Sequence, residues 1–300
     1  MNFIIEADII VKYEVIKMTT GLVLEGGGMR GIYTAGVLDC FLDNDVLFNY
    51  VIGVSAGGNM AASYLSKQKG RNKKVSLDFL DDKRYLSLTN YIKNKEMFGM
   101  DFIFDEIPRE HVPFNMEDFL LYNGEYVIAC TNCETGETEY FNKAYLRKDL
   151  MTILRASSSL PLMAPIVEYD GKKLLDGGVT DPIPLRKAQR DGMINNVVVL
   201  TRPKGYVKRS SRLSKYFKVK GYKKVDEAMQ KRPAIYNETL QYVDNQEQNG
   251  HAIVIRPSKD LKVDRMEKDR NKLSAMYDLG YQDALDKISQ IKEWLKTQEN

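Results

Sequence analysis

Short apolar runs alternate with helical patterns in the first part of the chain. Residues 21–25 form an apolar run that ends at three glycines, and apolar side chains then recur at helical spacing until Asp43. Residues 50–54 form a second apolar run, and residues 56–65 again have a helical pattern. This order of strand, helix, strand and helix is typical of parallel strands joined by right-handed crossovers, so it predicts an α/β fold.

Further strands and one long helix are predicted in the rest of the chain. Glu134-Thr135-Gly136 supplies the turn residues of a β-hairpin, and apolar side chains at helical spacing from Tyr277 to Leu295 predict one amphipathic helix. The additional strand patterns occupy residues 126–131, 138–141, 173–175, 196–200 and 252–256.

The chain has no internal repeat and no Pro- or Ser-rich linker, so a single domain over residues 18–300 is expected, with its motifs in a core at about 21–200. Residues 1–17 are interpreted as an N-terminal extension outside this domain. Charged residues interrupt their apolar character and they lack the small residues of a cleaved secretion signal. Met18 is an alternative start.

Composition narrows the class of protein and the chemistry open to it. The chain of 300 residues is 43% hydrophobic and 28% charged, which excludes a disordered chain and a membrane-spanning bundle. Three Cys cannot form a disulfide framework, so a cytoplasmic protein is expected. With only His111 and His251 present, any catalytic scheme must use one His or none. No metal site and no cofactor are predicted.

A glycine-rich loop follows the first predicted strand and opens the first helix. Glycines allow a sharp turn and bring backbone N–H groups close to a ligand. The loop has three interpretations: a dinucleotide pyrophosphate site, an oxyanion hole, or a tight turn. The dinucleotide site needs an acidic residue at the end of the next strand, where this chain has a serine motif instead. The residues of the loop are Gly26, Gly27, Gly28, Met29, Arg30 and Gly31.

The second predicted strand ends in a G-x-S-x-G motif. Gly53, Ser55 and Gly57 occupy its defining positions, and a helical pattern begins directly after the serine. A serine on such a strand-to-helix turn is exposed to a substrate, and its neighbours must be small because the chains run close. One helix separates this motif from the glycine loop, so we expect both at the same edge of the sheet. Ser55 is therefore the candidate nucleophile, with glycine N–H groups to hold an oxyanion.

A serine nucleophile needs a group that takes its proton, and Asp176 is the candidate. Asp176 ends a predicted strand and is followed by Gly177 and Gly178, whereas Asp170-Gly171 and Asp191-Gly192 are interpreted as plain turns. The order Ser55, Asp176, His251 also fits a catalytic triad. His251 follows an Asn-Gly turn, however, and a turn residue is the preferred interpretation.

Together these motifs resemble those of the patatin-like phospholipase family. The resemblance rests on GGGMRG at residues 26–31, GVSAG at 53–57, DGG at 176–178 and ASSSLP at 156–161, and it covers about residues 21–200. It implies a three-layer α/β/α fold with a mainly parallel central sheet. It also implies an acyl-ester hydrolase of bacterial patatin-like type, with Ser55 as nucleophile and Asp176 as proton acceptor. Backbone N–H groups around Gly27 and Gly28 would form the oxyanion hole, with Arg30 nearby. Family substrates are glycerophospholipids, lysophospholipids and neutral acyl esters.

Three weaker features leave alternatives open. Cys130 and Cys133 have metal or redox spacing but no second pair, so they are interpreted as incidental thiols. The stretch of residues 97–119 is rich in Met and Phe, which favours either core packing or an acyl-chain pocket or cap near Ser55.

A basic strip begins at Arg202 and ends at Arg232. It contains twelve Lys or Arg against two acidic residues, with aromatic residues between them. The strip is interpreted either as a solvated surface or as a peripheral contact with an anionic membrane, and no nucleic acid is expected as a partner. A non-catalytic binding module on the same fold, or a nucleotide-binding protein, is the alternative to a lipid hydrolase.

Overall fold

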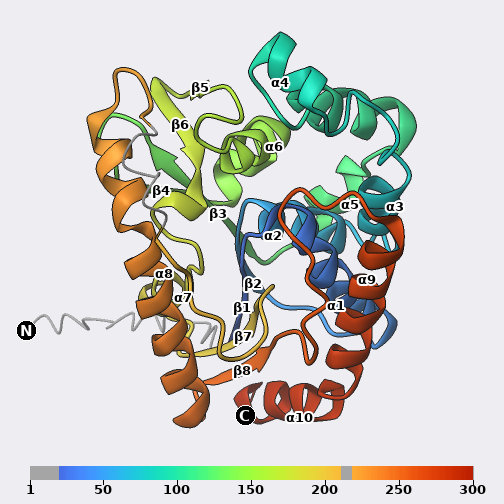
Figure 1. Cartoon of the computed structure of the whole chain (residues 1–300). Helices are drawn as coiled ribbons and strands as arrows, with labels where there is room; N and C mark the ends of the chain where they lie inside the picture. Colours follow the sequence, from blue (N-terminus) through green and yellow to red (C-terminus); the bar gives the residue numbers. More distant parts are fainter. Residues whose placement is uncertain (1–19, 211–217, 300) are drawn as a thin grey trace, which may run out of the picture.

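The computed structural model describes residues 20–210 and 218–299, and within them the strands form one eight-stranded sheet (Figure 1). The strands pair in the order β5-β6-β3-β2-β1-β7-β8, and β4 pairs with the edge of β3 opposite β2 and β6. The strands are β1 Thr20–Leu24, β2 Tyr50–Val54, β3 Glu125–Asn132, β4 Thr138–Phe141, β5 Val167–Tyr169, β6 Lys172–Asp176, β7 Asn195–Val199 and β8 Ala252–Ile255.

Five neighbouring strands, β3, β2, β1, β7 and β8, run parallel, whereas β4 and β6 each pair antiparallel with β3, and β5 pairs antiparallel with β6. The helices that matter for the site are α1 Ile32–Asp43, α2 Ala56–Leu65, α6 Lys143–Ser158, α7 Leu185–Arg190, α8 Lys223–Gln248 and α9 Arg270–Leu285. The remaining helices are η1 Gly28–Gly31, α3 Arg71–Leu77, α4 Leu88–Asn94, α5 Met116–Leu121, η3 Gly177–Val179 and α10 Ile288–Glu299, and a π-helix, η2, spans Phe102–His111.

Helices cover both faces of the sheet, as Figure 1 shows for α8 on one side and for α1, α2 and α9 on the other. Alternating side chains of each strand pack toward these two layers. In β1, Leu22 and Leu24 belong to the core under α1, α2, α6 and α9, and Val23 belongs to the core under α7 and α8. The three-layer α/β/α fold with a mainly parallel sheet is therefore confirmed.

Helices α1 and α9 cross at two glycines. A Cβ built on Gly36 would lie 2.1 Å from the carbonyl oxygen of Tyr277, and one on Gly280 would lie 2.1 Å from the carbonyl oxygen of Tyr33. Without side chains at these points the two backbones touch directly. Three hydrogen bonds of 2.7–2.8 Å reinforce the crossing: Tyr33–Asp283, Tyr277–Asp39 and Tyr281–Asp43. A helix from the last third of the chain is thus packed tightly against the first helix.

The structure corrects one sequence-based element and confirms others. The single amphipathic helix expected from Tyr277 to Leu295 is two helices, because the chain breaks between α9 and α10. The hairpin at Glu134-Thr135-Gly136 is confirmed, as are the turns at Asp170-Gly171 and Asp191-Gly192. Residues 1–17 lie outside the described part of the chain. Within the described residues, no helix combines the length and the hydrophobicity needed to cross a membrane.

Candidate active site

Ser55 lies on a strained turn between β2 and α2. Its backbone has φ 53° and ψ −124°, a left-handed conformation that is rare for a residue with a side chain. The turn depends on glycines, because a Cβ on Gly53 would lie 2.7 Å from the backbone N of Gly58, and one on Gly57 would lie 2.6 Å from the carbonyl oxygens of residues 24 and 25. The sharp strand-to-helix turn expected from G-x-S-x-G is present.

A neighbouring serine holds the backbone of this turn. The N–H of Ser55 donates to Oγ of Ser157 over 2.8 Å, and the hydroxyl of Ser157 donates to the carbonyl oxygen of Ala129 over 2.7 Å. Ser157 comes from the end of α6, and its side chain is fully buried. The strained turn is therefore tied to β3 through one buried hydroxyl.

Asp176 meets Ser55 where β6 and β2 end, along one edge of β3. Residues 128–131 of β3 pair with β4 along one edge, and along the other edge Ala129 pairs with Val54 of β2 and Cys130 pairs with Asp176 of β6. Strands β2 and β6 thus meet end to end on the same edge of β3, which brings Ser55, the residue after Val54, next to Asp176. The hydroxyl of Ser55 donates to Oδ2 of Asp176 over 2.8 Å. The chain can turn away after Asp176 only because Gly177 has no Cβ, which would lie 2.1 Å from the carbonyl oxygen of Ala129.

The carboxylate of Asp176 is buried and well bonded. Its side chain is 2% exposed, and Oδ1 accepts a hydrogen bond from the N–H of Gly178 over 2.7 Å. Burial raises the pKa of Asp176, and the nearby Arg232 guanidinium and the Ser55 hydroxyl partly offset that rise. A raised pKa makes this carboxylate a stronger base than an exposed aspartate.

The glycine loop lies against Ser55 at the end of β1. A Cβ on Gly26 would lie 3.2 Å from Cβ of Ser55. Gly28 has φ +58° and faces Arg265, whose carbonyl oxygen accepts the Met29 N–H over 3.0 Å. Within the described residues, the N–H groups of Gly27 and Gly28 have no hydrogen-bond acceptor. The Met29 N–H is thus engaged elsewhere, whereas two neighbouring donors of the loop remain available.

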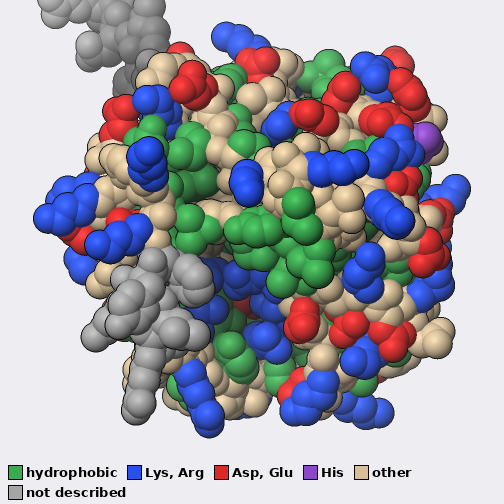
Figure 2. Space-filling view, turned by 45° about the horizontal axis from the view of Figure 1, so that its top comes forward, with side chains coloured by type: hydrophobic (Ala, Val, Ile, Leu, Met, Phe, Trp, Pro, Cys, Tyr) green, Lys and Arg blue, Asp and Glu red, His purple; other side chains and the backbone are tan. Residues whose placement is uncertain are grey.

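Two cavities meet at Ser55. Both are lined by Gly28, Ser55 and Leu160. The larger, of about 370 Å³, also contains Asp176 and several Lys and Arg side chains, and we call it the cationic cavity. The other, which we call the apolar cavity, has mainly hydrophobic walls. Figure 2 shows a hollow in which Lys and Arg side chains gather beside hydrophobic ones. The Met- and Phe-rich stretch supplies Phe98, Met100, Ile103 and Phe104 to the apolar cavity.

Comparison with known proteins places this site in a family. A family model described as patatin-like phospholipase matches residues 22–188, more than half of the chain. The chain belongs to the patatin-like phospholipase family. A second family model, described as a domain of unknown function (DUF6363), matches residues 222–296.

Individual relatives of this patatin-like chain match about three fifths of it. The uncharacterized protein YjjU of Escherichia coli K12 is 30% identical over 190 residues, which are 61% of this chain and 52% of YjjU. Lysophospholipase NTE1 of Saccharomyces cerevisiae is 30% identical over 177 residues, 57% of this chain and 10% of that protein. The chain thus spans about half the length of YjjU and about a tenth of the lysophospholipase. Among solved structures, VipD of Legionella pneumophila has a TM-score of 0.55 at 13% identity, covering 91% of this chain and 67% of that one, which supports the fold.

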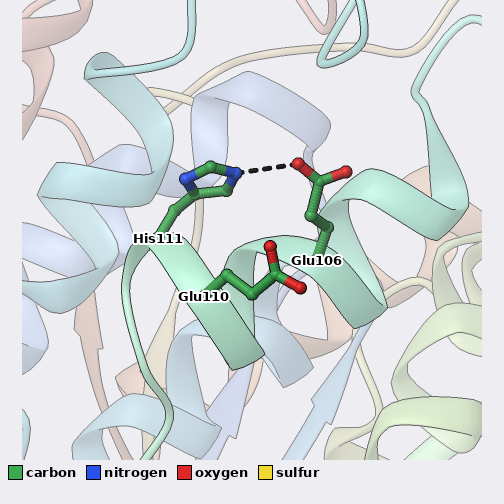
Figure 3. A group of neighbouring side chains, drawn as sticks. All are labelled: Glu106, Glu110 and His111. Carbon is green, nitrogen blue, oxygen red and sulfur yellow. Dashed lines mark hydrogen bonds and ion pairs between the residues drawn. The ribbon is translucent and has the colours of Figure 1, made fainter.

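The two histidines lie apart from the patatin-like site. His251 precedes β8 at the amino ends of the parallel strands, whereas Ser55 follows the carboxyl end of β2, so the two lie at opposite edges of the sheet. His111 is exposed at the end of η2, where its Nε2 lies 2.8 Å from Oε1 of Glu106 (Figure 3). A Ser55–Asp176–His251 triad is therefore not assembled.

Figure 3 shows Glu106, Glu110 and His111 close enough together to surround a metal ion. Glu106 already forms an ion pair of 2.6 Å with Arg84, and Glu110 is exposed. None of the three lines either cavity at Ser55. Cys130 and Cys133 are buried free thiols, and burial raises the pKa of both, which opposes thiolate chemistry.

Sequence reasoning missed several residues around the nucleophile. Ser157 was seen only as part of a small-residue block, with no signal that its hydroxyl would hold Ser55. Arg202, Lys208 and Arg232 were interpreted as part of an exterior basic strip, yet all three line the cationic cavity. The chain brings them there through β7 and α8, elements whose arrangement is set by distant contacts. Residues 211–217 of the strip lie outside the described residues.

Proposed function

We propose that this chain is a serine acyl-ester hydrolase of phospholipase A type that cleaves lipid acyl esters with Ser55 and Asp176. The observation that carries the proposal is the 2.8 Å hydrogen bond from a serine on a strained turn to a buried carboxylate, at the point where two cavities meet. The membership in the patatin-like phospholipase family and the similarity to lysophospholipases support a lipid as substrate.

In the first half-reaction, Oγ of Ser55 attacks the ester carbonyl carbon while its proton passes to Oδ2 of Asp176. The carbonyl oxygen becomes an oxyanion, and the unengaged N–H groups of Gly27 and Gly28 are the donors proposed to stabilise it. The carbon–oxygen bond to the alcohol then breaks, the proton on Asp176 moves to the leaving oxygen, and an acyl-Ser55 ester remains. The carboxylate of Asp176 carries out both proton transfers of this half-reaction, so no imidazole is required.

In the second half-reaction, water attacks the acyl-Ser55 carbonyl and gives a proton to Asp176. Collapse of the intermediate releases the fatty acid, and Oγ of Ser55 takes the proton back. The apolar cavity suits the acyl chain in both steps, because its walls include Met60, Met100 and Phe104 and it opens at Ser55.

A probe and a hydrolysis assay test this proposal together. A fluorophosphonate probe should label the wild-type protein at Ser55, and the protein should hydrolyse p-nitrophenyl butyrate. We expect Ser55→Ala and Asp176→Asn each to lower kcat by about a hundredfold or more. Asp181→Asn is the matched control, because Asp181 is another carboxylate whose pKa is raised by burial, and its Oδ2 bonds Tyr140 outside both cavities.

The outcomes separate the alternatives. Absence of labelling and of hydrolysis would favour a non-catalytic binding module. Full activity in Asp176→Asn, with loss in a double variant of His111 and His251 to Ala, would replace the Ser–Asp pair by a histidine mechanism.

We also propose that residues 18–300 act as one domain. The segment matched by the second family model contains β8, which extends the same sheet, and α9, which crosses α1 at two glycines.

Peripheral contact with anionic membranes is proposed for exposed cations of the basic strip, such as Lys204, Arg209 and Lys231. Co-sedimentation with liposomes that contain or lack acidic lipid measures this membrane contact. Equal binding to both kinds of liposome would contradict the proposal.

A further inference from the structure

The cationic cavity beside Ser55 holds more positive than negative side chains. Three carboxylates line it, Glu25, Asp176 and Asp264. Glu25 is committed to the hydroxyl of Tyr236 and the N–H of Thr201, both at 2.6 Å, and Asp176 is committed to Ser55. Five cations line the same cavity: Arg30, Arg202, Lys208, Arg232 and Arg265.

These cations lack the partners that surface cations usually have. None of the ion pairs formed among the described residues includes any of the five. Arg30 is 6% exposed, and its buried Nε has no acceptor in the part of the chain that the structure describes. The buried Nε of Arg202 also has none among the described residues. Because buried donors are nearly always bonded in folded proteins, two orphaned guanidinium nitrogens at one cavity point to a missing acceptor.

The five cations also crowd one another. Burial and the nearby Arg202 lower the pKa of Arg30 to about 10. Burial, together with Arg232, Arg265 and Arg30, lowers the pKa of Lys208 to about 7, although Glu25 opposes this. Such mutual repulsion costs stability in the empty protein, and a bound anion would relieve it.

We propose that the cationic cavity binds the phosphate of a lipid headgroup and that the enzyme prefers acyl esters whose headgroup carries a net negative charge. This inference rests on the proposed hydrolase function. With the ester carbonyl at Ser55, the acyl chain enters the apolar cavity and the headgroup enters the cationic one. Guanidinium groups suit phosphate because they donate several hydrogen bonds in a fixed plane.

The aromatic residues of the cavity argue against a choline headgroup. Quaternary ammonium groups bind over aromatic rings. Here the guanidinium of Arg202 lies 4.6 Å from the ring centre of Tyr206, and the Lys208 ammonium lies 5.0 Å from that of Tyr236. The rings already face cations of the protein, so a choline group would meet like charges. A zwitterionic headgroup therefore gains less in this cavity than an anionic one.

The segment matched by the domain of unknown function supplies two of the cations that line the cationic cavity. Arg232 comes from α8, where its Nε donates to the carbonyl oxygen of Gly178 next to the catalytic carboxylate. Arg265 precedes α9, and its backbone holds Met29 of the glycine loop. The segment thus places two headgroup cations beside the proposed catalytic residues. Arg202 and Lys208 make no hydrogen bond to the catalytic residues among those described, so they are the better positions for a test.

The experiment uses the full chain and lysolipids that share one acyl chain, each below its critical micelle concentration. Lysophosphatidic acid and lysophosphatidylglycerol are anionic, lysophosphatidylcholine is zwitterionic, and monoacylglycerol is uncharged. We expect kcat/KM for the anionic lipids to exceed that for the choline lipid by about tenfold or more, since each charge-assisted contact is worth roughly that factor. Arg202→Gln and Lys208→Gln should each lower this ratio several-fold, and Arg202→Lys should restore part of it. Lys259→Gln, at an exposed cation outside the basic strip and outside both cavities, is the control and should leave the ratio unchanged.

The outcomes distinguish this inference from the function on which it rests. A wild-type protein that fails to hydrolyse even p-nitrophenyl butyrate would contradict the hydrolase. A protein that cleaves this ester but treats all four lysolipids alike, or prefers the choline lipid, would overturn the inference alone.

A binding measurement separates a lipid headgroup from a free phosphate. By calorimetry with Ser55→Ala, lysophosphatidic acid should bind at least about tenfold more tightly than inorganic phosphate, because only the lipid also fills the apolar cavity. Equal affinity for the two would identify a site for free phosphate and overturn the headgroup assignment.

Discussion

Gly36 of α1 and Gly280 of α9 lie where the two helices cross, and replacing either by alanine is expected to destabilise the protein. A Cβ on Gly36 would lie 2.1 Å from the carbonyl oxygen of Tyr277 and 2.8 Å from the N of Tyr281. Both neighbours are backbone atoms, so they cannot rotate away as a side chain could. Ordinary contact begins at about 3.4 Å, so the helices must separate by more than an ångström.

The size of the effect follows from two contributions. Overpacking of this kind costs about 1–3 kcal/mol. Separation also stretches the three Tyr–Asp hydrogen bonds that span the crossing, and hydrogen bonds to charged groups contribute about 1.5–3 kcal/mol each when they are well shielded. Partial loss of these bonds brings the expected total to about 3–5 kcal/mol, which corresponds to a fall in Tm of about 5–8 °C for a protein of this size.

Thermal unfolding followed by circular dichroism measures this directly. Helix propensity alone predicts the opposite sign, because alanine is more favourable than glycine in a helix by about 1 kcal/mol. Ala275→Leu, at an exposed position of α9, adds bulk without touching α1 and serves as control. The double variant of Gly36 and Gly280 should lose less than the sum of the two single losses, since the helices need to separate only once. An unchanged or raised Tm for Gly36→Ala would refute the reasoning.

Three further predictions concern the active site. Arg232 lowers the pKa of Asp176, so Arg232→Met should raise that pKa and move the acid limb of kcat/KM to higher pH; a limb that stays in place or moves down contradicts it. Because burial raises the folded-state pKa of Asp176, its ionised form destabilises the fold above the ordinary carboxyl pKa, and this cost fades as the pH falls. Asp176→Asn should therefore increase Tm at pH 7 by more than at about pH 4. A larger increase in Tm at pH 4 than at pH 7, measured by calorimetry, would contradict this prediction. Met60→Trp should fill the apolar cavity and reduce hydrolysis of long-chain esters more than of butyrate, so equal losses in a chain-length series would count against an acyl site there.

The nucleophile region was predictable because its signals are local. The apolar run at β2 and the helical pattern at α2 reproduce the observed bounds to the residue, since glycines and a serine mark the boundary between them. The chemistry of Asp176 was also indicated by its sequence context. The sequence did not indicate how Asp176 comes close to Ser55, because β6 is antiparallel to β3 and meets the parallel strands from the opposite direction. Only the pairing of both β2 and β6 with β3 reveals that Asp176 lies next to Ser55.

The surroundings of the site could not be predicted in the same way. Arg232 and Arg265 lie far from Ser55 in sequence, and their positions depend on how α8 packs on the sheet and on how α9 crosses α1. A run of Lys and Arg residues has the same sequence pattern whether it faces solvent or lines a cavity, so the basic strip did not indicate the cationic cavity. The break between α9 and α10 was hidden for a similar reason, because apolar spacing continues across it while the backbone turns.

The contact between Met29 and Arg265 has a consequence for biosynthesis. A ribosome makes the chain from its amino end, so the glycine loop, Ser55 and Asp176 all emerge before the residue on which the loop rests. Until α9 has docked on α1, the contact that fixes the Met29 N–H and faces Gly28 is missing, and the donors proposed for the oxyanion have no defined direction. A growing chain would therefore carry Ser55 early but complete the surroundings of Ser55 late, which separates the synthesis of the proposed nucleophile from the time at which the proposed hydrolysis could begin.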